Sequence, residues 1–156
     1  MASVGEREAT NGSRARSAAF AWAPVALWIA IIWILGGEAF AVTETTSFIV
    51  PLLHSLFPCL PPETLDAAHY TLRVLAHPTQ YAVLALLAQR AFRATVARRW
   101  TPLAGSLSLV LAVAIADELR QAAGSARTGA STDVALDFAG GVAALGVAFV
   151  LRRLRG

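Results

Sequence analysis

Lysine is absent from this 156-residue chain, so all thirteen basic residues are arginine, and cysteine occurs once, at Cys59. A single cysteine excludes an intrachain disulfide and any zinc or redox site built from paired cysteines. Charge is scarce as well, since only 15% of the residues are charged and the formal net charge is +3. Hydrophobic residues make up 56% of the chain. That balance does not suit a soluble domain of this size, but it is typical of an integral membrane protein with one compact unit.

Four apolar stretches are suited to crossing a bilayer, which takes about 20 apolar residues each. They cover about 18–37, 72–92, 102–119 and 134–151. The second is the least apolar, and His77, Pro78 and Gln80 in its first half predict a polar, kinked entrance. The sequence therefore predicts an all-α, four-helix transmembrane bundle over 18–151, between a polar tail at 1–17 and a basic tail at 152–156.

The connection between the first two stretches carries apolar residues at helical spacing from Phe48 to Phe57. This pattern predicts an interfacial amphipathic helix in the first loop. Prolines 61 and 62 end it, and a second amphipathic stretch over 63–76 leads into the second span. Ala39-Phe40-Ala41 is similar to a signal-peptidase site, but the preceding apolar run is longer than a signal peptide's, so we expect the first helix to be retained.

Arginines gather at the ends of the apolar stretches, which is a membrane-topology pattern rather than a nucleic-acid one. With both termini and the second loop in the cytoplasm, ten of the thirteen would lie inside: Arg7, Arg14, Arg16, Arg90, Arg93, Arg98, Arg99, Arg152, Arg153 and Arg155. The positive-inside rule favours this orientation. Most acidic residues then fall at the outer face, and no nucleic-acid partner is expected.

In an up-and-down bundle, the start of the second span, the end of the third and the start of the fourth share the outer face. Residues of these segments are spaced by four on each helix, so they form inward-facing stripes. Ionisable groups at membrane depth are costly and are usually paired or functional. The candidate ligand-binding residues are Arg73, His77, Tyr81, Asp117, Glu118, Gln121, Arg127, Asp133 and Asp137. The alternative is that these residues only pair with each other to register the helices.

Two spaced motifs in these segments resemble the VanZ-like family of small membrane proteins. The first is Arg73-Val-Leu-Ala-His77-Pro-Thr-Gln-Tyr81, and the second runs from Asp117-Glu118-Leu-Arg120-Gln121 through Arg127-Thr-Gly-Ala-Ser to Asp133-Val-Ala-Leu-Asp137-Phe-Ala-Gly140. The resemblance covers about 21–151. Arg120 stands where the family often has histidine, and Gln80 where it often has glutamate. The resemblance implies a four-helix, multi-pass protein of the bacterial inner or plasma membrane, in a family whose namesake is associated with resistance to teicoplanin.

Our first functional hypothesis is a non-enzymatic envelope protein that binds an anionic or lipid-linked ligand, such as a cell-wall intermediate, at the outer-face pocket. Arg73 and Arg127 would hold phosphate or carboxylate through their planar forks of donors. No cofactor is expected. Membrane lipids are the other expected partners.

A membrane-embedded hydrolase or transferase acting on a lipid-linked substrate is the alternative function. A hard divalent metal would then be held by Asp117, Glu118, Asp133 and Asp137. His77 would be its general acid or base. The small residues Gly140, Ala144 and Ala148 predict a close helix contact, either within the chain or in a homodimer.

Overall fold

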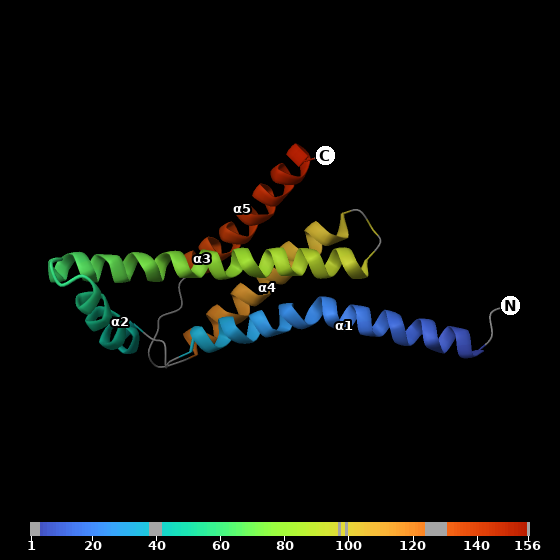
Figure 1. The fold of residues 1–156 in the computed structure, drawn as a ribbon, viewed down its shortest axis with the longest axis horizontal. Coiled ribbons are helices and arrows are strands. Elements are labelled where there is room, and N and C mark those ends of the chain that lie inside the picture. Colours follow the sequence, from blue (N-terminus) through green and yellow to red (C-terminus); the bar gives the residue numbers. More distant parts are fainter. Residues whose placement is uncertain (1–3, 38–41, 97, 99, 124–130, 156) are drawn as a thin grey trace.

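A computed structural model describes residues 4–37, 42–96, 98, 100–123 and 131–155. Throughout these residues the regular structure is helical, which confirms the expected all-α fold (Figure 1). The helices are α1 (Val4–Leu35), α2 (Val42–Leu56), α3 (Pro62–Thr95), α4 (Thr101–Ala122) and α5 (Ser131–Arg155).

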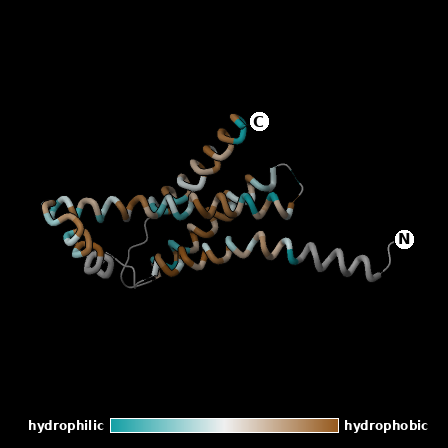
Figure 2. The backbone as a smooth tube through the Cα atoms, viewed as in Figure 1, coloured by the Kyte–Doolittle hydropathy of each residue, from teal (hydrophilic) through white to brown (hydrophobic). Residues whose placement is uncertain are grey.

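Three of these helices are long and apolar enough to cross a membrane. The segments are Arg16–Leu35 of α1, Thr101–Ala122 of α4 and Thr132–Arg155 of α5, matching the first, third and fourth predicted spans. Many of their large apolar side chains are exposed, as a lipid-facing surface requires. Brown stretches of these helices in Figure 2 are the hydrophobic ones. A fourth crossing by α3 remains a prediction, because polar residues interrupt the apolar character of that helix.

α3 is the central helix, since each of the other four contacts it. Its start follows from Pro62, whose missing N–H is no loss in a first turn, and from Glu63, whose charge suits the helix N-terminus. Its end at Thr95 follows from the extended backbone of Val96. The two segments predicted at 63–76 and 72–92 are therefore parts of one continuous helix.

Pro78 lies inside α3, which continues past it as a single helix. The kink expected there stays a prediction. Gly140 of α5 packs directly on the Pro78 backbone, where a Cβ at position 140 would collide with the Pro78 carbonyl. α5 therefore approaches α3 closely at the proline, which removes a backbone hydrogen bond of the helix.

α1 runs antiparallel to α3 along the bundle. The Trp28 Nε1–H donates a hydrogen bond of 2.9 Å to the backbone carbonyl of Gln80. Trp22 meets Phe92 edge to face, with ring centroids 4.8 Å apart. The buried core draws on all four long helices: Ala21, Val25, Ile32, Tyr81, Leu84, Ala85, Ala91, Val110, Val113, Ala114 and Leu145. Small residues on α3 let its neighbours approach closely.

α2 and the first half of α3 project together beyond the other helices (Figure 1). α2 packs on α3, and apolar side chains at and just after its end remain exposed, among them Leu52, Leu56 and Phe57. The helix expected in the first loop is therefore present. Its exposed apolar residues suit a position at a membrane interface.

Candidate functional site: a polar cluster where four helices converge

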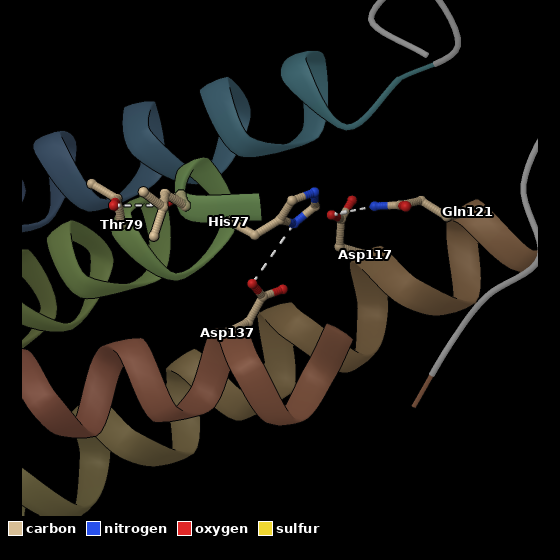
Figure 3. Close-up of polar contacts among 6 residues, drawn as sticks. His77, Thr79, Asp117, Gln121 and Asp137 are labelled. Carbon is tan, nitrogen blue, oxygen red and sulfur yellow. Dashed lines mark hydrogen bonds and ion pairs between the residues drawn. The ribbon is translucent and has the colours of Figure 1, made fainter. Parts of the chain in front are cut away.

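Four helix segments meet at one end of the bundle. They are the end of α1, the middle of α3 around His77, the end of α4 and the start of α5. Figure 3 shows His77 of α3 lying with Asp117 and Gln121 of α4 and with Asp137 of α5. The up-and-down arrangement predicted from the sequence thus brings the polar stripes of three helices to one place, which we name the polar cluster.

Asp117 is the best-satisfied member of the polar cluster. Its side chain is 5% exposed, and it accepts hydrogen bonds from Arg120 Nη2 at 2.7 Å and from Gln121 Nε2 at 2.8 Å. Both donors lie one turn further along α4, so the spacing of three and four residues places them on the same face. A buried carboxylate needs such partners, because removing the charge from water is expensive.

The end of α1 closes over this carboxylate. A Cβ at Gly36 would stand 2.8 Å from Arg120 Nη2 and 3.1 Å from Asp117 Oδ2, so a larger residue would make the ion pair shift. α1 therefore shields the Asp117–Arg120 ion pair from one side. Gly36 is therefore one of the residues that form the polar cluster.

Asp137 links the start of α5 to α3. Its Oδ1 lies 3.7 Å from Nδ1 of His77, an ion-pair distance that is too long for a hydrogen bond. The Asp137 side chain is 6% exposed and that of His77 26%. Oδ1 of Asp137 makes no hydrogen bond to the described part of the chain, where the more distant histidine is its one ionic contact.

Tyr81 follows His77 by one helical turn, on the same face of α3. The residue is 1% exposed, and its buried hydroxyl has no hydrogen-bond partner among the residues that the structure describes. It is within electrostatic range of Asp117, Asp137 and Glu118. A buried hydroxyl without a partner is uncommon in folded proteins and calls for a functional or structural explanation.

Seven of the nine predicted site residues are described in full and meet in this region: His77, Tyr81, Asp117, Glu118, Gln121, Asp133 and Asp137. Arg73 lies on α3 one turn before His77, but its side chain is outside the described residues, as is the whole of Arg127. The two arginines expected to hold an anion are thus the two that the structure does not describe.

Two residues of the site were not among the predicted ones. Arg120 stands where the VanZ-like family often has histidine and was not predicted as a site residue, yet it is the ionic partner of Asp117. The spacing of three residues between them was the available signal. Gly36 was the other, and the Gly36-Gly37 pair at the end of the first apolar stretch was its only trace in the sequence.

The alternative metal site of Asp117, Glu118, Asp133 and Asp137 stays a prediction. Among the residues that the structure describes, no group of three or more His, Cys, Asp and Glu side chains is arranged to hold a metal ion. Asp117 is instead directed to Arg120 and Gln121, and Asp137 to His77.

The small-residue face of α5 is used within the chain at its first glycine. Gly140 packs on Pro78, and Gly141 lies against Val110 and Ala85. These contacts with α3 and α4 account for the two glycines. A homodimer through Gly140, Ala144 and Ala148 remains a prediction.

Comparisons with known proteins leave the assignment to the residues themselves. No model of a known protein family matches the chain. No curated protein and no solved structure matches it either.

Proposed function

We propose that this chain is a four-span membrane protein of the VanZ-like type that binds the polar head of an amphipathic envelope molecule at the polar cluster. The observation that carries the proposal is the Tyr81 hydroxyl, which is buried without a hydrogen-bond partner beside the incompletely satisfied Asp137. If these residues only fixed the helices in register, burying the two atoms unpaired would bring no benefit. Each buried polar atom costs desolvation free energy, and phenylalanine at position 81 or asparagine at position 137 would lower that cost. A bound head group supplies the missing partners.

The central position of α3 supports its role as the fourth span. Its 34 residues make a helix about 50 Å long at 1.5 Å per residue, more than the roughly 30 Å of a hydrocarbon core. Two of its polar side chains, those of His77 and Gln89, are directed toward α5, where they meet Asp137 and Arg152 and are shielded from lipid. Both termini are then cytoplasmic, in a bacterial inner or plasma membrane, and the polar cluster lies at the outer face.

The chemistry of the cluster favours a head group with hydroxyl or amine donors. Its described residues include four carboxylates, of Asp117, Glu118, Asp133 and Asp137, against Arg120 and His77. A sugar-bearing, lipid-linked cell-wall intermediate offers such donors, and its phosphate would require Arg73 and Arg127 as predicted from the sequence. The proposed ligand therefore carries hydroxyl or amine donors, which bind the acidic residues, and an anionic group, which binds the two arginines.

Native mass spectrometry of the gently purified chain tests this proposal, because a retained amphipathic molecule is identified by its mass. We expect Tyr81→Phe to lower retention by about tenfold, the effect of losing one hydrogen bond to the ligand. The chain has one other tyrosine, Tyr70, which is 69% exposed, so Tyr70→Phe is the matched control and should retain the ligand fully.

The double variant Arg73→Ala/Arg127→Ala addresses the anionic part of the ligand in the same spectra. Loss of retention with the fold intact supports a phosphate or carboxylate at these arginines. Equal retention by the wild type, Tyr81→Phe and the double variant contradicts the binding proposal. Reduced susceptibility to teicoplanin, which the family resemblance implies, is checked by comparing a host strain with and without the gene.

The enzyme alternative keeps one supporting observation, the contact of His77 with Asp137. A histidine oriented by a carboxylate suits proton transfer near neutral pH. The described residues form no metal group for the proposed hydrolysis, so binding is the function we favour. Turnover of a retained lipid-linked molecule on adding Mg²⁺ or Mn²⁺, abolished by His77→Gln, would reverse that preference.

A further inference from the structure

A hollow lies between α3, α4 and α5, at the end of the bundle opposite the polar cluster. It is a groove with a volume of about 580 Å³. Its walls are mostly apolar, and they include Leu103, Leu107, Leu145 and Phe149. None of the residues of the polar cluster lines it, so the groove is a separate site.

Three arginines stand around this groove, and no acidic side chain is among the described residues that line it. They are Arg93 at the end of α3 and Arg152 and Arg153 at the end of α5. Arg93 and Arg152 are close enough to interact electrostatically. Positive charge therefore accumulates beside an apolar surface with no counter-charge in the groove, an arrangement that an anion relieves.

Two of these arginines, Arg152 and Arg153, are held in place by their neighbours. Nη2 of Arg152 donates to Oε1 of Gln89, a residue that is 5% exposed, and its Nε donates to the Ala148 carbonyl at 3.1 Å. The guanidinium carbon of Arg153 lies 5.3 Å from the centre of the Phe149 ring, a cation–π distance. Side chains fixed in this way lose little freedom when they bind a ligand.

The floor of the groove has room for a chain of methylene groups. At Gly146 a Cβ would have no atom within 4 Å, unlike at the tightly packed Gly140. An amphipathic anion matches both parts of the site, with its charge at the arginines and its hydrocarbon along the apolar wall. In the orientation proposed above, this end faces the cytoplasmic leaflet, where anionic lipids attract clustered arginines.

We propose that this groove seats one anionic phospholipid of the cytoplasmic leaflet, with its phosphate among Arg93, Arg152 and Arg153. One acyl chain lies along Leu107 and Leu145 and over Gly146. The lipid occupies a site distinct from the polar cluster. The inference shares with the proposed function only the placement of the chain in the membrane.

The test compares lipid retention in native mass spectra after reconstitution with equal amounts of phosphatidylglycerol and phosphatidylcholine. The wild type should retain one phosphatidylglycerol per chain, with a preference of about tenfold or more over phosphatidylcholine, since each arginine near the phosphate favours the anion. Replacing all three groove arginines, in Arg93→Gln/Arg152→Gln/Arg153→Gln, should abolish that preference.

Two further variants separate the groove from general surface charge and from loss of the fold. Gly146→Leu fills the open floor without touching an arginine, and it should lower retention of both lipids. Arg90→Gln/Arg155→Gln removes two exposed arginines that do not line the groove, and it should keep the preference. Circular dichroism establishes that each variant remains helical.

Equal retention of the two lipids by the wild type overturns the inference. So does a preference for phosphatidylglycerol that survives both the triple arginine variant and Gly146→Leu. A second copy of the chain in place of lipid, seen as a dimer that Gly146→Leu dissociates, also overturns it. Because the polar cluster is intact in all of these variants, retention of its own ligand reports separately on the proposed function.

Discussion

Asp137 at the start of α5 faces His77 of α3 across 3.7 Å, with no hydrogen bond closing the gap. The contact joins the two helices at the polar cluster, close to where Gly140 packs on Pro78. Among the basic side chains that the structure describes, only His77 contacts this buried carboxylate, at a distance that gives no hydrogen bond. The carboxylate is well placed to accept a hydrogen bond from a ligand.

A double-mutant cycle measures how strongly the two residues interact without a ligand. We expect His77→Asn and Asp137→Asn to couple by about 0.5–1 kcal/mol in the free energy of unfolding in detergent, as is common for polar pairs between membrane helices. Reversible unfolding monitored by circular dichroism provides the four values. Fully additive effects of the two substitutions would show that the contact contributes nothing to stability.

Tyr81→Phe should leave the unliganded protein as stable as the wild type, or more stable by up to about 1 kcal/mol, because the lost hydroxyl has no hydrogen bond to lose and no longer needs to be desolvated. Tyr81→Ala, which removes the buried ring, should cost about 3–5 kcal/mol. Unfolding in detergent after removal of bound lipid checks both. A loss of more than 1 kcal/mol in Tyr81→Phe would mean that the hydroxyl has a partner in the protein.

Two glycines of α5 should respond in opposite ways to the same small change. A Cβ at position 140 collides with the Pro78 backbone, whereas one at position 146 meets nothing within 4 Å. Gly140→Ala should therefore destabilise the protein by about 1–3 kcal/mol as α3 and α5 separate. Gly146→Ala should be neutral or stabilise it by up to about 1 kcal/mol, through helix propensity. Equal melting temperatures of the two variants would contradict the α3–α5 packing.

Helix content and the meeting of the polar stripes were predictable because both follow from spacing. Runs of about 20 apolar residues indicate the helices, and polar residues four apart mark one face of each. The neighbour of Pro78 was not predictable, because it depends on tertiary packing. Nothing in the local sequence shows that Gly140, sixty-two positions later, packs on the backbone there.

The candidate site was predictable as a set of residues, and its pairs only in part. His77 was one of the partners that the spacing allowed for Asp137, and the two side chains do contact each other. The pairing of Asp117 with Arg120, on its own helix, was not predicted. Whether an arginine turns toward the bundle or toward solvent depends on the space beside it. For Arg120 that space is left by Gly36 at the end of a different helix.

The single cysteine provides the most direct test of the central claim, that α3 crosses the membrane and sets the polar cluster at the outer face. Cys59 is exposed and precedes α3, and the exposed Arg98 follows it. The measurement is labelling of intact cells by a membrane-impermeant maleimide. The wild type reports position 59, and Cys59→Ser/Arg98→Cys reports position 98.

We expect Cys59 to be labelled in intact cells, and the cysteine at position 98 to be labelled only after the membrane is permeabilised. With α3 outside the membrane, both positions would lie on the same side, between α1 and α4. Labelling of both in intact cells, or of neither, would contradict the four-span account and remove the polar cluster from the outer face.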